Sequence, residues 1–211
     1  MQRFAAFDID QTLYAGTLAH DFVIELINHG VIPSDLEEVQ KYFTNTSDEA
    51  LVNALQQAQS LGQMSFKDYV QVGIDTAVSV AINTNRAVYD LMHKAWAVDG
   101  MTTIAISTSP YAVVKPFCDN VGPFEFVIAP MAQNIDGFVG PRSIIRASER
   151  TKGEWLQGLI DLFGFVLKDS IAIGDSATDI SMLELVERPI AYRPTPELRQ
   201  VAEARAWEIW N

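Results

Sequence analysis

The feature that most constrains the fold of this chain is a change of pattern at Gly100. After Gly100, short apolar runs typical of buried strands alternate with longer segments typical of helices. The expected strands are 102–106, 124–128, 170–173 and 189–192, and the expected helices are 111–121, 151–163 and 178–186. Such alternation predicts an α/β fold with a doubly wound parallel sheet, whose ligands bind at the carboxyl ends of the strands.

A single strand is expected before this alternating part. Residues 3–7 form an apolar run, and residues 17–98 then show only helical patterns. Candidate helix starts are the capping box at 34–37, Ser47 and Ser65. Because the first strand precedes the helical block and the other strands follow it, we interpret the block as an insertion over the strand ends. We therefore expect an α/β core at 1–14 and 99–211 and an all-helical cap domain at 15–98.

Composition excludes several classes of protein. Of the 211 residues, 48% are hydrophobic and 20% are charged, which is an ordinary globular composition. The net charge is −12, so the chain lacks a general footprint for nucleic acid, and we expect no nucleic acid partner. No window approaches the ~18 apolar residues of a membrane span, so we expect no membrane contact and a cytoplasmic location. The single cysteine, Cys118, allows no internal disulfide.

Polar clusters follow three of the expected strands. They consist of Asp8, Asp10 and Thr12 after the first strand, Ser107 after the strand at 102–106, and Asp175 and Asp179 after the strand at 170–173. A bare Asp-x-Asp is expected roughly once by chance, but a preceding apolar run and a Thr two residues later make it rare. A Gly-Asp-x-x-x-Asp motif after a second apolar run is about equally rare. Together the two motifs indicate an acidic site at one edge of the sheet.

The acidic cluster requires a cation, because carboxylates gathered at one place repel one another. A hard divalent ion with oxygen ligands suits them, and Mg²⁺ fits best because it combines a few carboxylates with water and phosphate oxygens. Lys152, at the start of the helix expected at 151–163, supplies a further positive charge. The Ser107 hydroxyl supplies a hydrogen-bond donor. We therefore expect the ligand to carry a phosphoester group.

The ordered motifs around Asp8, Ser107, Lys152 and Asp175 resemble the four motifs of the haloacid dehalogenase (HAD) superfamily. Within it, the tracts at 106–110, 136–140 and 191–207 resemble the phosphoserine-phosphatase-like hydrolases of subfamily IB. Those hydrolases carry a helical cap between the first and second motifs, at the place of the helical block here.

The resemblance implies a two-step phosphoryl transfer from a small phosphorylated metabolite. Asp8 would be the nucleophile that forms an aspartyl-phosphate, and Asp10 the general acid and then the general base. The remaining implied roles are phosphate binding by Ser107 and Lys152, Mg²⁺ binding by Asp8, the carbonyl of Asp10, and Asp175, and support by Asp179 and Thr12. An Asp at position 10 favours phosphate over halide chemistry, because the dehalogenase branch lacks that acid.

The sequence departs from the phosphoserine phosphatases at three positions. Thr17 stands where those enzymes carry a Glu for the substrate ammonium, and Gly73, by an ungapped comparison, stands where they carry an Arg. Gln11 replaces a commoner Gly. We therefore do not expect phosphoserine itself to be the substrate.

Other interpretations of the same residues remain open at this point. A phosphotransferase or mutase uses the same aspartyl-phosphate, and a catalytically silent scaffold keeps the fold without turnover. A signalling receiver domain gathers similar residues, but it is too compact to hold a helical insertion of roughly 80 residues. Ser107 is also a candidate helix cap and Lys152 a candidate surface lysine, whereas His20 and Asp21 fit a solvated helix face.

Overall fold

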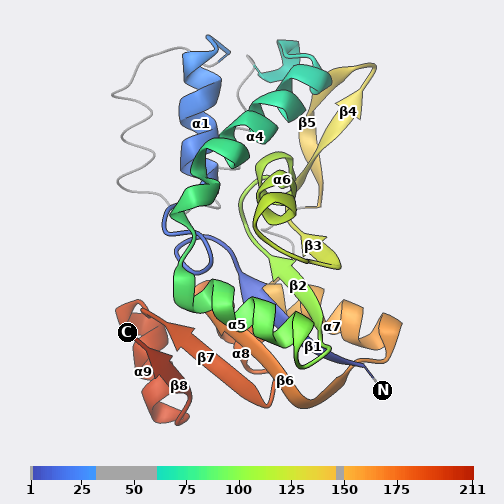
Figure 1. The fold of residues 1–211 in the computed structure, drawn as a ribbon. Helices are drawn as coiled ribbons and strands as arrows, with labels where there is room; N and C mark the ends of the chain where they lie inside the picture. The colour runs from blue at the N-terminus through green and yellow to red at the C-terminus, as the bar shows by residue number, and fades with distance from the viewer. Residues whose placement is uncertain (1, 32–60, 146–149) are drawn as a thin grey trace.

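The computed structural model describes residues 2–31, 61–145 and 150–211 of the chain. The helix starts expected at 34–37 and at Ser47 lie outside the described residues. Figure 1 shows a twisted sheet with its helices in the lower part of the view and a smaller layer above it.

Six parallel strands form the central sheet in the described part of the chain. Their order is β3-β2-β1-β6-β7-β8, with β1 Arg3–Asp8, β2 Thr102–Ile106, β3 Phe126–Ile128, β6 Val166–Gly174, β7 Arg188–Tyr192 and β8 Glu208–Trp210. The register sets Asp8 opposite Ile106 and Phe7 opposite Ile173. The residues that follow β1, β2 and β6 therefore meet at one edge of the sheet, as the sequence predicts.

Different helices cover the two faces of the sheet. Along β1, Ala5 and Phe7 belong to one apolar cluster, and Phe4 and Ala6 to a second. This division arises because successive residues of a strand point to opposite faces. The first cluster includes α5 (Arg86–Ala97) and α6 (Tyr111–Val121), and the second includes α7 (Lys152–Phe163), α8 (Ile180–Leu183) and α9 (Pro196–Ala204). The sheet is therefore doubly wound, which confirms the expected fold class.

Two helices lie beyond the carboxyl ends of the strands, in the upper layer of Figure 1. They are α1 (Leu18–Asn28) and α4 (Phe66–Val80), and they pack against each other. The rings of Phe22 and Tyr69 meet edge to face between them, with centroids 5.1 Å apart. Ser65 caps α4 by accepting a hydrogen bond from the N–H of Asp68, as expected. Short 3₁₀ turns, η1 (Leu61–Gln63) and η2 (Ala81–Asn83), flank α4.

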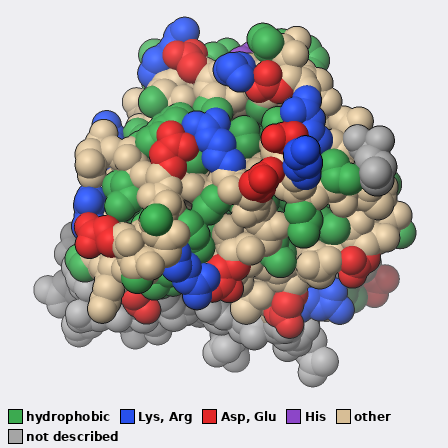
Figure 2. All heavy atoms as spheres, turned by 90° about the horizontal axis from the view of Figure 1, so that it is seen from below, with side chains coloured by type: hydrophobic (Ala, Val, Ile, Leu, Met, Phe, Trp, Pro, Cys, Tyr) green, Lys and Arg blue, Asp and Glu red, His purple; other side chains and the backbone are tan. Residues whose placement is uncertain are grey.

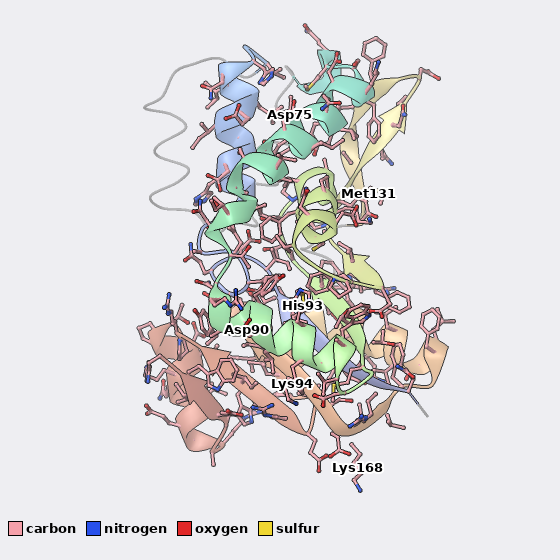
Figure 3. All side chains as sticks on the ribbon, in the orientation of Figure 1. Asp75, Asp90, His93, Lys94, Met131 and Lys168 are labelled. Atoms are coloured by element: carbon pink, nitrogen blue, oxygen red, sulfur yellow. The ribbon has the colours of Figure 1, made fainter. Side chains whose placement is uncertain are left out.

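Helix α5 falls within the range expected for the cap, yet it packs on the sheet. Its buried side chains, among them Val88 and Met92, share the apolar cluster of Phe7. Its outer face carries the charged side chains Asp90 and Lys94, visible in Figure 3. The described part of the helical block is thus divided between the upper layer, where α1 and α4 lie, and the sheet.

An antiparallel hairpin of β4 (Met131–Ile135) and β5 (Phe138–Ile145) adds strands to the upper layer. No strands were expected from the sequence at this place. The turn residues Asp136 and Gly137 have φ angles of +50° and +89°, the left-handed conformation of two-residue hairpin turns. The N–H of Phe66 donates to the carbonyl oxygen of Gly137 (2.7 Å), so the hairpin is joined to the start of α4.

Two elements near the site differ in length from expectation. The strand expected at 170–173 extends over all of β6, and the helix expected at 178–186 consists of a 3₁₀ turn, η3 (Ala177–Asp179), followed by the short α8. The 3₁₀ turn is the tighter of the two helices, and it brings Asp179 back toward the end of β6.

The outer surface carries mixed charges. Figure 2 shows the molecule from below, where basic and acidic side chains are interspersed among apolar ones on the described part of that face. Among the described residues, no helix is both long enough and apolar enough to cross a membrane.

Close packing of α4 against α6 depends on Gly73. A Cβ atom at this position would lie 2.1 Å from the carbonyl oxygen of Ala112 and 2.6 Å from its carbonyl carbon. Real Cβ atoms do not approach a backbone so closely, so the two helices meet only because position 73 has no side chain.

We predict that Gly73→Ala destabilises the protein by about 1–3 kcal/mol, although Ala is the better helix former. The matched control is Gly158→Ala on α7, where a Cβ atom meets nothing within 4 Å. This control should stabilise the protein by about 0.5–1 kcal/mol. Urea denaturation of both variants measures the difference, and a stabilised Gly73→Ala variant would contradict the packing argument.

Candidate active site

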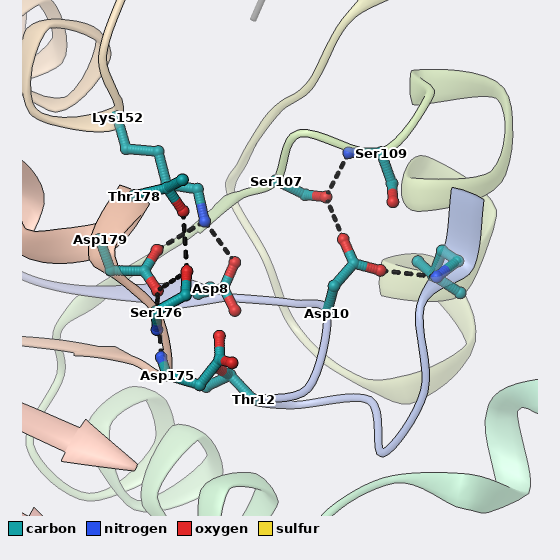
Figure 4. A network of polar contacts seen from close by, with 11 residues as sticks. Asp8, Asp10, Thr12, Ser107, Ser109, Lys152, Asp175, Ser176, Thr178 and Asp179 are labelled. Atoms are coloured by element: carbon teal, nitrogen blue, oxygen red, sulfur yellow. Dashed lines mark hydrogen bonds and ion pairs between the residues drawn. The ribbon is translucent and has the colours of Figure 1, made fainter. Parts of the chain in front are cut away.

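The fold gathers at one sheet edge the side chains that the sequence singled out. Asp8 is the last residue of β1, Ser107 follows β2, and Asp175 follows β6. Lys152 is the first residue of α7, and it points at the end of β1 from across the site (Figure 4). Helix α7 begins at this residue because Thr151 and Glu154 form a capping box.

Lys152 pairs with two carboxylates. Its Nζ lies 2.5 Å from Oδ1 of Asp8 and 2.6 Å from Oδ1 of Asp179. All three side chains are buried, with Lys152 only 4% exposed, so this lysine is not a surface residue. Burial lowers the pKa of Lys152, but the charges of Asp179 and Asp8 and the hydrogen bonds to them outweigh burial and raise that pKa. Lys152 therefore carries its positive charge at any physiological pH.

The Asp8 carboxylate is only half satisfied. Its Oδ1 accepts from Lys152, whereas its Oδ2 is buried without a hydrogen-bond partner among the described residues. Burial raises the pKa of Asp8 well above its usual value, Lys152 opposes this rise, and Asp179, Asp175 and Asp10 add to it. A buried acceptor without a partner is costly in a native protein and requires an explanation.

Asp179 is the most firmly held carboxylate of the cluster. Its Oδ2 accepts from the N–H of Asp175 and the N–H of Ser176, both at 3.0 Å, and its Oδ1 accepts from Lys152. It is completely buried. With its oxygens already engaged, Asp179 serves to orient Lys152 and the loop after β6.

A metal ion with oxygen ligands fits this arrangement. Carboxylate oxygens of Asp8, Asp175 and Asp179 all lie within 4.8 Å of one another. Burial, followed by the charge of Asp179, raises the pKa of Asp175 to about 7, although Lys152 opposes this. A divalent metal ion bound here would satisfy Oδ2 of Asp8, which lacks a partner among the described residues, and would stabilise the ionised form of Asp175. The hydroxyl of Thr12 lies 3.5 Å from Oδ1 of Asp175, at the margin of this cluster.

The Asp10 carboxylate lies apart from these three, on the side of the site toward β2 and α1 (Figure 4). Its Oδ2 accepts from the Ser107 hydroxyl (2.8 Å), and its Oδ1 accepts from the N–H of Leu18 (2.6 Å). Ser107 therefore does not cap the next helix, whose N-cap residue is Pro110. The metal ligand expected at residue 10 was its backbone carbonyl, and that role stays a prediction.

One residue of the site was missed from the sequence. Ser109 is fully buried; its N–H donates to Oγ of Ser107 (2.9 Å) and its Oγ accepts from the N–H of Ala19 (3.0 Å). A serine that precedes Pro110 at the start of a helix has the sequence pattern of a loop residue. The only sequence feature that could have pointed to Ser109 is the repetition of serine within 106–110. Asp21, expected on a solvated helix face, instead accepts a hydrogen bond from the Tyr14 hydroxyl (2.6 Å).

Comparison with known proteins places this site within a family. The family described as haloacid dehalogenase-like hydrolase matches residues 5–184 of the chain. A Streptomyces azureus protein named for inhibition of morphological differentiation is 36% identical over 110 residues, which are 52% of this chain and 40% of that protein. The chain thus spans less than half of that relative.

Two further relatives match almost the whole chain. A Mycobacterium tuberculosis protein named phosphoserine phosphatase SerB1 is 27% identical over 97% of this chain and 69% of its own length. A Neisseria meningitidis protein named histidinol-phosphatase is 21% identical over 100% of this chain and 99% of its own length.

Solved structures share the fold. A protein of unknown function from Bordetella pertussis superposes with a TM-score of 0.82 at 21% identity, covering 100% of this chain and 99% of that one. A substrate-bound phosphoserine phosphatase superposes with a TM-score of 0.69 at 16% identity, covering 100% and 93%.

We predict that Asp175→Asn stabilises the metal-free protein at pH 7 by roughly 1–4 kcal/mol. The pKa of Asp175 is raised to about 7 in the folded state, so the folded protein binds more protons than the unfolded chain between about pH 4 and pH 7. The contribution of Asp175 to the stability of the metal-free folded protein therefore falls as the pH rises from about 4 to about 7. Urea denaturation with a chelator at pH 4.5 and pH 7 measures this, and an equal effect of the substitution at both pH values would contradict it.

Proposed function

Because this chain belongs to the haloacid dehalogenase-like hydrolase family, we propose that it is a Mg²⁺-dependent phosphatase acting on a small phosphorylated metabolite. The observation that best supports this proposal is how the two carboxylate oxygens of Asp8 are bonded. One oxygen of its carboxylate is held by buried Lys152, and the other has no hydrogen-bond partner in the described part of the chain. A carboxylate fixed beside a cation at the end of a central strand is suited to attack phosphorus.

Asp8 acts as the nucleophile. One of its carboxylate oxygens attacks the phosphorus in line with the ester oxygen, so that a bond from Asp8 to phosphorus forms while the ester bond breaks. Water then attacks the phosphorus of the resulting aspartyl-phosphate. This second step releases inorganic phosphate and restores the Asp8 carboxylate.

Asp10 transfers the protons. In its protonated form it gives that proton to the departing alkoxide in the first step. The resulting carboxylate takes a proton from the attacking water in the second step, which restores the protonated form. Its carboxylate accepts from the Ser107 hydroxyl and the N–H of Leu18, so both of these hydrogen bonds come from neutral donors, whereas the ammonium group of Lys152 pairs with other carboxylates.

Lys152 and Ser107 bind the transferring phosphoryl group from two sides. Lys152 is buried beside the nucleophile, where a point charge acts strongly. The Ser107 hydroxyl has one hydrogen, which it donates to Asp10 in this structure. When a phosphoryl oxygen takes that hydrogen bond, Asp10 loses a donor and is better able to accept a proton.

The residues that would hold Mg²⁺ are Asp8, Asp175 and the backbone carbonyl of Asp10. When bound, the ion stabilises the negative charge that develops on the phosphoryl oxygens. The charge of the site supports its presence: with all groups ionised, four carboxylates and one lysine give −3, and a divalent ion reduces this to −1. A site of net charge −1 repels a dianionic phosphate less than a site of −3, and the donors of Lys152 and Ser107 offset the repulsion that remains.

We propose a substrate without a carboxylate group. The resemblance to phosphoserine phosphatases calls for a substrate-reading Arg near position 73, but Gly73 packs directly on the backbone of Ala112 and leaves no space for any side chain. At position 17, in place of a Glu, the Thr17 hydroxyl accepts a hydrogen bond from Gln11 (3.4 Å). The Neisseria relative is named for histidinol phosphate, an amino alcohol ester that has no carboxylate.

The phosphotransferase alternative differs only in the acceptor of the aspartyl-phosphate, so product analysis separates the two activities. The silent scaffold would keep the fold without turnover. The receiver domain is set aside because the chain belongs to another family. The cytoplasmic location expected from the sequence stays a prediction.

We predict that Asp8→Asn lowers phosphatase activity by at least about 10³-fold, because it removes the nucleophile. The assay is release of inorganic phosphate from a generic aryl phosphate and from phosphorylated metabolites, with Mg²⁺ or with a chelator. The matched control is Asp161→Asn, an exposed residue of α7 that pairs with Gln157, and it should keep wild-type activity. Wild-type turnover that is insensitive to the chelator or survives in Asp8→Asn would refute the mechanism.

We predict that kcat/KM for histidinol phosphate exceeds that for phosphoserine by at least about tenfold. A substrate carboxylate that meets no compensating cation beside the acidic residues of the site costs binding energy, and each ~1.4 kcal/mol is a factor of ten. Both esters are assayed side by side with the wild-type protein. A preference for phosphoserine would show that another group in the cap reads the carboxylate.

A further inference from the structure

The N-terminus of α1 takes its hydrogen-bond partners from the core of the protein. The first four N–H groups of a helix have no partner within the helix. The N-cap residue Thr17 provides no side-chain capping bond. Instead, the N–H of Leu18 donates to Oδ1 of Asp10 (2.6 Å), and the N–H of Ala19 donates to Oγ of Ser109 (3.0 Å).

These bonds close a ring through the end of β2. The N–H of Ser109 donates to Oγ of Ser107 (2.9 Å), whose hydroxyl donates to Oδ2 of Asp10 (2.8 Å). The Asp10 carboxylate is thus held by the core through one oxygen and by α1 through the other, as Figure 4 shows. Ser107 and Ser109 are 0% exposed and Asp10 is 7% exposed, so water competes little for these bonds.

We propose that Ser109 is a positioning residue that fixes the Asp10 carboxylate by anchoring the first turn of α1. This inference rests on the proposed function, in which Asp10 is the general acid and base. The Ser109 hydroxyl holds Ala19, the neighbour of the residue that donates to Asp10, and the Ser109 amide orients the Ser107 hydroxyl. Ser109 thus acts on the hydrogen bonds that Asp10 accepts from Leu18 and from Ser107. Proton transfer depends on such placement, because a group displaced by an ångström loses much of its effect.

The test compares three variants. Ser109→Ala removes the hydroxyl but keeps the amide, and Ser109→Thr keeps both. The control is Ser170→Ala, because Ser170 is also 0% exposed and bonds a backbone carbonyl, but it lies four residues before the end of β6. We expect Ser109→Ala to lower kcat about tenfold with KM changed less than about twofold, as for a lost hydrogen bond that positions a catalytic group. Ser109→Thr should keep most of kcat, and Ser170→Ala should keep all of it, whatever their melting temperatures.

A second set of variants asks whether Ser109 acts through Asp10. In an Asp10→Asn background the group to be positioned has lost its proton-transfer function, so adding Ser109→Ala should change the residual kcat less than about twofold. A further tenfold loss in that background, or equal kcat for Ser109→Ala and Ser170→Ala in the wild-type background, overturns the proposal.

Amide hydrogen exchange tests the anchor without reference to activity. Exchange at residues 18–21 should be faster in Ser109→Ala than in wild type and unchanged in Ser170→Ala. Unchanged exchange in Ser109→Ala overturns the anchor even if kcat falls. If the wild-type protein turns over no phosphoester, as expected for Asp8→Asn, the proposed function is refuted, and the positioning role is refuted with it. An active wild type whose Ser109→Ala variant matches the control refutes the positioning role alone.

Discussion

The rest of the site depends on one buried ammonium group between two buried carboxylates. Lys152 neutralises part of the charge that β1 and β6 bring together in Asp8 and Asp179, with contacts of 2.5 and 2.6 Å. Removing one member of such a group leaves an unpaired buried charge, which costs about 3–5 kcal/mol. The capping box fixes the first turn of α7, and therefore Lys152, relative to the sheet. Burying three charged groups contributes little to the stability of the fold, so their presence at the strand ends favours a role in catalysis.

Two glycines make this charge arrangement sterically possible. A Cβ atom at Gly174 would lie 2.4 Å from Cγ of Asp179, and one at Gly153 would lie 2.4 Å from the carbonyl oxygen of Ser181. Without side chains at these positions, Asp179 folds back onto the end of β6, and α7 packs against the start of α8. The Gly-Asp-x-x-x-Asp motif therefore has a structural meaning: the glycine provides space, and the second aspartate fills it beside Lys152.

Sequence reasoning succeeded where local pattern decides structure. The strand at 102–106 was predicted with its exact bounds. Its short run of β-branched and apolar residues follows a glycine turn and ends at polar groups, and this local pattern is typical of a buried strand in a parallel sheet. It failed where tertiary contacts decide. The helical pattern of α5 is the same whether it packs on α4 or on the sheet, and Met131–Ile135 alternates too weakly to predict a strand. Similarly, the Ser109 hydroxyl accepts from the N–H of Ala19 on α1, which lies 90 residues away in sequence, and no local pattern indicates this contact.

The polar residues of the site form two networks with different anchors. Asp8, Lys152, Asp175 and Asp179 are held by the sheet and by α7, elements of the core alone. The ring of Asp10, Ser107 and Ser109 closes only through the first turn of α1, which belongs to the layer above the strand ends. A shift of α1 therefore moves Asp10, the proposed proton-transfer group, but leaves Asp8, the proposed nucleophile, in place. If the upper layer contacts the substrate, then substrate fit acts on leaving-group protonation and on hydrolysis of the intermediate, and the rate of nucleophilic attack depends on the core.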